Sequence, residues 1–352
     1  MNGRYRRGHV IAAVAGLVMI GALGVFGATP PDRASAGRLP EPTGGYGWPI
    51  KPFDQPHPVR ANFGDPRTVF HGPPTARTLY HAGGSYTFHH GVDISAPEGT
   101  KVYPVRDGIV VFDSASHVSV KSADGTVFQY WHIGASFPPG TLVRARRTVL
   151  GTIRHAVLHV DLTEIDNGQV VNPLAPGHLT PYRDTTRPVV AGIRLQGDNA
   201  GHVLFPNLVS GPVWLVAEAF DKPSLTTLDN WRRLPVTPAL VTWRIQATNG
   251  NVVVPTRVAA DFRTTVPGNK EFWSTYARGT FQNMAVFAGH YSYLQPGSYL
   301  FLLAPTRFDT KSLRDGVYDL VVTATDIRGN SSSRSLRFTV HNAPVAAPAE
   351  AP

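Results

Sequence analysis

The segment that decides the fold is FHHGVDISAPEGTKV, Phe88 to Val102, in which two histidines and an aspartate surround a glycine. On an extended strand, residues four apart lie roughly 13 Å from each other, too far to share a metal with ligand bonds of about 2 Å. His89 and Asp93 can therefore reach one metal only if the chain bends between them. Gly91 supplies the backbone freedom for that bend, so the segment predicts part of a metal site.

A third metal ligand is expected in HAVLHVDL, His155 to Leu162. His159 lies on a β-type alternation that puts Val157 and Asp161 on the same face. We interpret Asp161 as a surface acid or as a group that supports a ligand, rather than as a ligand itself. Four histidines lie apart from this pattern: His90 is predicted at the rim, and His71, His81 and His117 are predicted in loops or on the surface.

The sequence around these segments predicts an all-β domain over residues 57–176. Short β-type runs alternate with turn signals such as Asp107-Gly108, Asp124-Gly125 and Pro139-Gly140. No helical periodicity of useful length interrupts them. The expected strands are Lys101–Val105, Gly108–Phe112, His117–Lys121 and Val127–His132.

Residues 57–176 resemble the lysostaphin-type (LytM-like) zinc endopeptidases, which cut peptide bridges of peptidoglycan. The resemblance covers about a third of the chain, and its pieces occur in family order. They are NFGDPR (Asn62 to Arg67), HHGVD (His89 to Asp93), APEGTKVYPVRDGIVV (Ala96 to Val111), YWH (Tyr130 to His132), VLH (Val157 to His159) and VNPL (Val171 to Leu174).

This resemblance implies a zinc site with three ligands, His89, Asp93 and His159, and an open fourth position. It places a catalytic histidine at His132. The other catalytic histidine of the family falls on Val157, and the loop before it is shortened to GTIRHA, Gly151 to Ala156. His155 is a candidate substitute, although it would need a local bulge to reach the metal.

A second β region is predicted over residues 184–342. Its ending, Asp315 to Val340, contains alternating runs at Tyr318–Thr325 and Leu336–Val340, joined by the turn-like Asp326–Asn330. This ending resembles immunoglobulin-like or fibronectin-like modules of bacterial surface proteins. The aromatic-rich stretch Glu271–Leu294 is interpreted as an insertion into that sandwich.

The remaining parts of the chain are interpreted as export and linking segments. Residues 1–36 read as a signal peptide or an amino-terminal anchor, because arginines precede an uncharged run over residues 10–28 that is long enough to span a bilayer. Residues 37–56 are expected to be a linker, and residues 343–352, rich in Ala and Pro, a disordered tail. We therefore expect a secreted or cell-envelope protein of a bacterium.

Composition narrows the class of partner. The 352 residues contain no cysteine, so disulfides cannot support this exported chain. The formal charge is +9, of which the four Arg and one Asp of residues 1–36 supply +3, leaving +6. Basic residues are scattered, which argues against nucleic acid. Peptidoglycan or wall peptides are the expected partners, and the oligomeric state is not predicted.

Three functions follow from these observations. The first is an exported zinc endopeptidase that acts on wall peptides, weakened by the loss of a histidine at Val157. The second is a zinc-binding protein without hydrolytic activity that docks on the cell wall or regulates a partner hydrolase. The third, a carbohydrate-binding or adhesive β-protein, rests on the aromatic residues of Glu271–Leu294.

Overall fold

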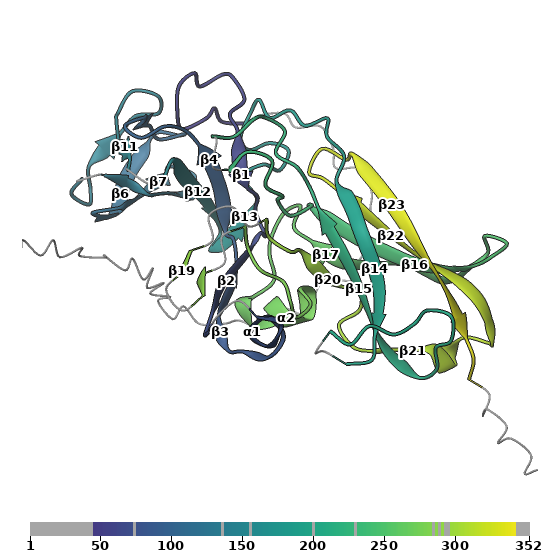
Figure 1. Ribbon diagram of the computed structural model, residues 1–352. Helices are drawn as coiled ribbons and strands as arrows, with labels where there is room; N and C mark the ends of the chain where they lie inside the picture. The colour runs from purple at the N-terminus through teal and green to yellow at the C-terminus, as the bar shows by residue number, and fades with distance from the viewer. Residues whose placement is uncertain are drawn as a thin grey trace, which may run out of the picture. The chain divides into compact units, whose positions relative to one another are not determined.

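The computed structural model describes residues 45–72, 75–134, 137–154, 157–198, 201–228, 231–283, 286–287, 290–291 and 296–342. Over these residues the chain is nearly all β, as the sequence predicts (Figure 1). The expected signal or anchor, His155 and the expected tail lie outside the described residues. No helix among the described residues is both long and apolar enough to cross a membrane.

An antiparallel sheet of eight strands carries the predicted metal residues. Its order is β1-β4-β12-β8-β7-β6-β10, and β13 pairs with β12. The strands are β1 (Val59–Ala61), β4 (Gly91–Ser95), β6 (Gly108–Ser114), β7 (His117–Ser122), β8 (Val127–Trp131), β10 (Leu142–Val143), β12 (His159–Asp166) and β13 (Gln169–Val171). The β-type runs expected around residues 108–132 are therefore confirmed.

Alternation along the central strands explains why this sheet has one apolar face. Val118 and Val120 of β7, Tyr130 of β8, and Val160 and Leu162 of β12 are all fully buried. Successive side chains on a strand point to opposite faces. The residues between these apolar positions therefore lie on the other face, which is where the predicted metal ligands belong.

Two small sheets flank the large one. The first has the order β5-β11-β9, and the second has the order β19-β18-β2-β3, in which β18 and β2 are parallel. Their strands are β2 (Pro66–Phe70), β3 (Gly84–Phe88), β5 (Lys101–Val102), β9 (Ile133–Gly134), β11 (Gly151–Ile153), β18 (Val286–Phe287) and β19 (His290–Tyr291). A late segment of the chain thus joins a sheet of the first region.

One short helix, α1 (Ala76–His81), departs from the expected absence of helix in the first region. The hydroxyl of Thr75 accepts a hydrogen bond from the backbone N–H of Thr78 at 3.2 Å, which caps the amino end of the helix. A helix of six residues is too short to show a helical period in the sequence.

The second region contains two further antiparallel sheets. Their orders are β14-β15-β20, with β21 pairing with β15, and β17-β16-β22-β23. The elements are β14 (Val189–Gln196), β15 (Pro212–Phe220), β16 (Leu240–Ala247), β17 (Val252–Asp261), the 3-10 helix η2 (Asn269–Glu271), α2 (Phe272–Thr275), β20 (Leu300–Leu302), β21 (Phe308–Asp309), the 3-10 helix η3 (Thr310–Ser312), β22 (Gly316–Thr325) and β23 (Ser331–Val340).

The hairpin expected at the end of the second region is confirmed. Strands β22 and β23 pair in register from Gly316–Val340 to Thr325–Ser331. In the turn, the carboxylate of Asp326 accepts hydrogen bonds from the backbone N–H groups of Arg328 at 2.8 Å and Asn330 at 2.9 Å. Gly329 has a φ of 89°, a conformation that glycine adopts without strain. Local turn chemistry therefore fixes this hairpin.

The core contains two segments that the sequence analysis placed outside it. Tyr46, Trp48 and Ile50, which lie within the linker expected over residues 37–56, are buried in the main hydrophobic cluster, so the chain packs on the core at these three residues. Phe272 and Tyr276, from the expected insertion, are buried in the same cluster. This cluster holds residues of both β regions. Separate folding of residues 57–176 and 184–342 stays a prediction.

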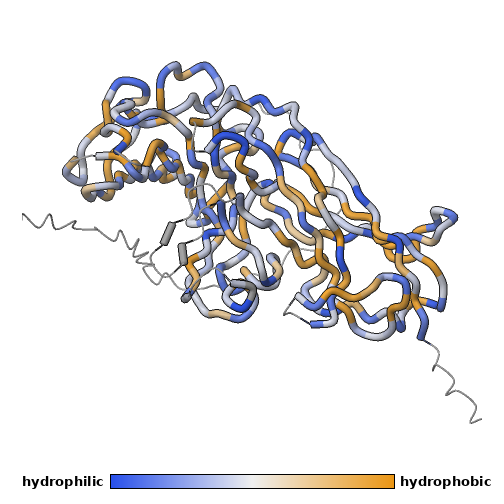
Figure 2. The backbone as a smooth tube through the Cα atoms, in the orientation of Figure 1, coloured by the Kyte–Doolittle hydropathy of each residue, from blue (hydrophilic) through white to orange (hydrophobic). Residues whose placement is uncertain are grey.

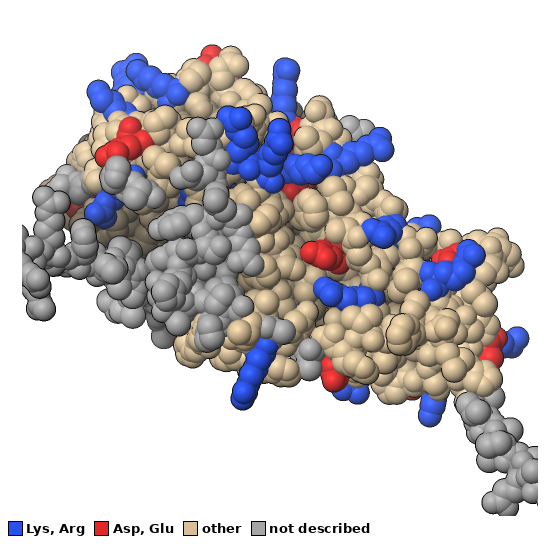
Figure 3. All heavy atoms as spheres, viewed as in Figure 1, with Lys and Arg blue, Asp and Glu red and all other residues tan. Residues whose placement is uncertain are grey.

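The distribution of hydrophobic and charged residues agrees with the scattered basic residues of the sequence. Figure 2 shows hydrophobic residues along the strands and hydrophilic residues concentrated in the connecting turns. Figure 3 shows Lys and Arg side chains at several places across one face, with Asp and Glu side chains among them. The basic charge visible on this face is therefore distributed over the surface and interrupted by acids.

Candidate metal centre

A row of polar and aromatic side chains crosses the face of the large sheet opposite its apolar core. Strand register pairs Asp93 of β4 with Asp161 of β12, and Asp161 with Trp131 of β8. It also pairs Trp131 with His117 of β7. Directly paired residues of antiparallel strands point to the same face. The two carboxylates and two aromatic rings therefore lie side by side, opposite the buried apolar face.

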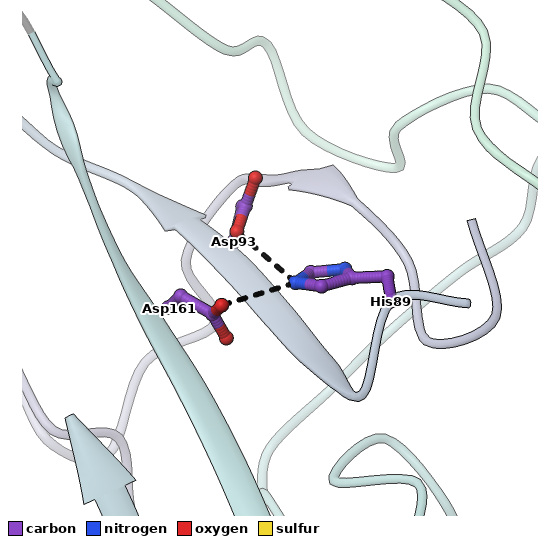
Figure 4. A group of neighbouring side chains, drawn as sticks. All are labelled: His89, Asp93 and Asp161. Atoms are coloured by element: carbon purple, nitrogen blue, oxygen red, sulfur yellow. Dashed lines mark ion pairs between the residues drawn. The ribbon is translucent and has the colours of Figure 1, made fainter. Parts of the chain in front are cut away.

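His89 reaches this row because the chain leaves strand β3 at Phe88 and enters β4 at Gly91. Its Nε2 atom lies 3.3 Å from Asp93 Oδ1 and 3.3 Å from Asp161 Oδ2. Figure 4 shows both carboxylates directed at the imidazole. The expected bend between His89 and Asp93 is therefore present.

Gly91 has a second role that the sequence did not indicate. A Cβ atom at this position would lie 2.5 Å from the carbonyl oxygen of Leu162 and closer still to Asp161 Oδ1. Because real Cβ atoms do not approach other atoms within 3.0 Å, only glycine fits here without displacement. The missing side chain therefore lets the Asp161 carboxylate lie against β4 and face His89.

Both histidines present Nε2 to Asp93. The Nδ1 atom of His89 lies 3.0 Å from the carbonyl oxygen of Asn62, and the Nδ1 atom of His159 lies 2.8 Å from that of Val157. A carbonyl oxygen only accepts, so each Nδ1 carries the hydrogen. His159 Nε2 lies 3.4 Å from Asp93 Oδ1. Metal-binding histidines are commonly oriented by such a bond at the other ring nitrogen.

These distances fit the ligands of a zinc ion. Bonds of about 2.0–2.2 Å in a tetrahedral site put two ligand atoms about 3.3–3.6 Å apart, and the three separations that involve His89, His159 and the two aspartates are 3.3–3.4 Å. His89 Nε2 and Asp161 Oδ1 are buried without a hydrogen-bond partner. The donor set of imidazoles and carboxylates suits zinc.

Asp161 belongs among the candidate ligands, whereas the sequence analysis gave it a supporting or surface position. His89, Asp93 and Asp161 offer ligand atoms that all lie within 4.8 Å of one another. The physical reason is the direct register of Asp161 with Asp93, which puts the two carboxylates on one face. His159 joins the group through its separation from Asp93 alone.

Two arginines neutralise the carboxylate of Asp93. Arg67 Nη2 lies 3.1 Å and Arg60 Nε lies 3.5 Å from Asp93 Oδ2. Burial raises the pKa of Asp93, but His159, Arg67 and His89 outweigh it and hold that pKa well below its usual range. Burial and Arg67 lower the pKa of His89. Asp161 and Asp93 raise it by more, so that the pKa is about 9. The site is therefore a dense network of charges.

His132, the predicted catalytic histidine, lies beside the third ligand. Its ring centroid is 4.6 Å from that of His159. Its φ is 67°, an uncommon left-handed conformation for a residue other than glycine. Burial lowers the pKa of His132, while Asp161 raises it less strongly. The imidazole is therefore neutral at pH 7 and able to accept a proton.

Val157 lies in a turn before strand β12, which begins at His159. Leu158 between them has a φ of 58°, so the β-type alternation expected through Val157 stops at His159. The alternation does hold from His159 to Asp161. The candidate substitute, His155, lies outside the described residues.

His117 is buried, contrary to the expectation of a loop or surface residue. Its side chain is 5% exposed, and its ring stacks on Trp131 with centroids 3.6 Å apart and planes 8° apart. Its Nε2 atom lies 2.9 Å from the hydroxyl of Ser119. His117 therefore supports Trp131 on the metal-binding face of the sheet, next to Asp161.

Among known proteins, the chain is similar only to solved structures. No protein-family profile and no curated protein matches the chain. The chain is similar to a mutant catalytic domain of the prophage-encoded M23 protein EnpA from Enterococcus faecalis, at 27% identity over 30% of this chain and 88% of that chain, with a TM-score of 0.22.

Two other solved structures show likenesses of the same extent. For the deep-sea M23 metalloprotease pseudoalterin the identity is 18%, over 38% of this chain and 81% of that chain, with a TM-score of 0.25. For a chain of the SpoIIQ–SpoIIIAH pore-forming complex it is 20%, over 34% of this chain and 90% of that chain, with a TM-score of 0.23.

Proposed function

We propose that residues 57–176 form a lysostaphin-type zinc endopeptidase domain that hydrolyses peptide bonds of peptidoglycan, at a reduced rate. The observation that carries this proposal is the convergence of two imidazole Nε2 atoms on Asp93 Oδ1, at 3.3 and 3.4 Å, with each Nδ1 held by a backbone carbonyl. Such pre-oriented donors are characteristic of metal sites. The proposed ligands are His89, Asp93 and His159, with Asp161 beside them.

The protein groups have distinct proposed roles. A bound zinc ion would polarise a peptide carbonyl and lower the pKa of a water molecule. His132, neutral at pH 7, accepts and returns a proton next to His159. Asp161 lies beside these ligands, with its Oδ2 atom 3.3 Å from His89 Nε2, and is a candidate for a further ligand. Because Val157 stands where the resemblance implies a second catalytic imidazole, we expect the reaction to be slow.

The test combines metal analysis with digestion of purified peptidoglycan. Wild-type protein should carry one zinc per chain and release free amino groups from the wall. His89→Ala should abolish stoichiometric zinc, because it removes the imidazole nearest both carboxylates. His132→Ala should keep the zinc and lower the rate by about 10²- to 10⁴-fold. Loss of zinc in His132→Ala, or its full retention in His89→Ala, would contradict these assignments.

A second candidate function is favoured by Val157. Because an apolar side chain stands where the resemblance implies a proton-transfer group, a zinc protein that docks on the wall or regulates a partner hydrolase also fits the site. The same assay separates the two candidates. Stoichiometric zinc without release of amino groups from any wall preparation would favour the non-catalytic protein.

The remainder of the chain is proposed to serve export and positioning. We propose a secreted or cell-envelope location, which rests on the arginine-led apolar run of residues 10–28. The two antiparallel sheets of residues 184–342 support an immunoglobulin-like sandwich that positions the first region on the wall. The burial of Phe272 and Tyr276 argues against a carbohydrate-binding surface built from these two aromatic residues.

A further inference from the structure

Arg60 enters the candidate metal centre from a β-bulge. Val59 pairs with Ile94 and Ala61 pairs with Asp93, so two steps along β1 oppose one step along β4. A bulge of this kind changes the direction of the extra side chain. Arg60 is only 6% exposed, and its guanidinium lies on the metal-binding face between Asp93 and His159.

The contact of Arg60 with His159 is incompatible with a metal at the same nitrogen. Arg60 Nη2 lies 3.3 Å from His159 Nε2. Because the hydrogen of this imidazole is on Nδ1, Nε2 has a single lone pair in the ring plane. That lone pair accepts either an N–H of the guanidinium or a metal ion, but not both. Repulsion between the guanidinium and a divalent cation adds to this exclusion.

An aromatic residue of the second region holds Arg60 in this position. The guanidinium carbon lies 3.6 Å from the ring centroid of Trp231, within the range of a cation–π contact. Trp231 is fixed in turn by a hydrogen bond from its backbone N–H to the carbonyl of Leu228 at 2.8 Å. The backbone N–H of Leu228 lies 3.5 Å from the hydroxyl of Ser95, at the end of β4.

The same segment is also attached on the other side of the site. The backbone N–H of Thr237 donates to the carboxylate of Asp65 at 2.6 Å, and the side-chain amide of Asn62 donates to the carbonyl of Thr237 at 3.0 Å. Asn62 is the residue whose carbonyl orients His89. The segment that carries Trp231 therefore binds to both flanks of the metal centre.

The hydrogen bonds of Arg60 are incomplete in this arrangement. Its Nε and Nη1 atoms are buried without a hydrogen-bond partner, although the group is charged. Burial lowers the pKa of Arg60 to about 10, so it remains a cation at neutral pH. A buried donor without an acceptor costs free energy. The position of Arg60 is therefore maintained by Asp93, His159 and Trp231 against that cost.

We propose that Arg60 and Trp231 form a latch through which the second region competes with the metal for Asp93 and His159. With the latch closed, the positive charge of the Arg60 guanidinium balances the negative charge of Asp93 in place of a metal ion. Zinc binding requires Arg60 to leave the lone pair of His159. This inference rests on the proposed zinc site, and it gives the segment around Trp231 a regulatory function.

The test is the zinc affinity of the full-length chain, measured in competition with a chromophoric chelator. Arg60→Met keeps an unbranched apolar stem and removes the guanidinium, so we expect affinity to rise about 10- to 100-fold, the equivalent of one charge-assisted hydrogen bond. Trp231→Ala leaves every metal-site side chain unchanged and should raise affinity about 2- to 30-fold. Cobalt absorption spectra report the ligand set in each variant.

Arg257→Met is the matched control, because Arg257 stacks on Trp243 with the guanidinium 5.6 Å from the ring centroid, in the β16–β17 pair. Its zinc affinity should equal that of the wild type. Thermal unfolding without metal checks that each variant is folded. If Arg60→Met does not fold, Trp231→Ala decides the question.

Equal or weaker zinc affinity in the folded Arg60→Met and Trp231→Ala variants would overturn the latch, even if the wild type hydrolyses peptidoglycan. Tighter zinc in both variants, without hydrolysis in any form, would overturn the proposed peptidase and leave the latch in place. Absence of zinc binding in the wild type and in both variants would overturn both proposals.

Discussion

Replacing Gly91 with alanine should damage both the fold and the metal centre. The added Cβ would meet the carbonyl oxygen of Leu162 at 2.5 Å and the hydroxyl of Thr163 at 2.7 Å. Strand β12 is paired with β4 on one side and β8 on the other, so its backbone has no room to retreat. Overpacking of this kind costs typically about 1–3 kcal/mol, and we expect about 3 kcal/mol for a clash with a central strand.

Urea unfolding of the metal-free chain measures this cost. With an m value of about 3 kcal/mol/M, the expected loss lowers the midpoint by about 1 M. Zinc stoichiometry should fall as well, because the new Cβ displaces the Asp161 carboxylate that faces His89. Gly134→Ala is the control, since a Cβ there meets no heavy atom within 4 Å. If Gly91→Ala shifts the midpoint no more than Gly134→Ala does, the packing argument is wrong.

Two other changes test the site and the second region. Val157→His adds an imidazole two residues before the third ligand, and hydrolysis of peptidoglycan should rise about 10- to 10³-fold at unchanged zinc content. No hydrolysis by either form, with zinc bound in both, would count against a peptidase. Burial, Asp184 and Asp326 raise the pKa of Asp221 to about 8. Because the folded state then holds its proton more tightly, the contribution of Asp221 to stability is full below about pH 4 and is lost as pH rises toward 8. Asp221→Asn should flatten that part of the profile in thermal unfolding, and an unchanged slope would refute the assignment.

The sequence determined the features that depend on local chemistry. Alternation of apolar residues predicted the strands around residues 108–132, because one face of each is buried. The turn Asp326–Asn330 predicted the hairpin, since Asp326 and Gly329 satisfy its geometry within a few residues. The spacing of His89, Gly91 and Asp93 predicted a bend, because no straight strand brings the two side chains together.

Tertiary structure alone decided which side chains complete the site. Asp161 faces His89 because β12 and β4 pair in a register that no local pattern specifies. His117 is buried because its paired neighbour Trp131 stacks on it, whereas its own segment carries no motif. The first effect depends on pairing between strands that are far apart in the sequence, and the second depends on the register of the β7–β8 hairpin.

The contact between Arg60 and Trp231 is the clearest case. Neither residue belongs to a recognisable pattern in the sequence, and they lie in the first and second β regions respectively. A bulge in β1 directs Arg60 inward, and hydrogen bonds of Leu228 and Thr237 hold the segment of Trp231 against it. The sequence by itself determined the strands, the turns and the types of ligand. Long-range packing decided which charged side chains meet at Asp93, because it brings together residues that lie far apart in the sequence.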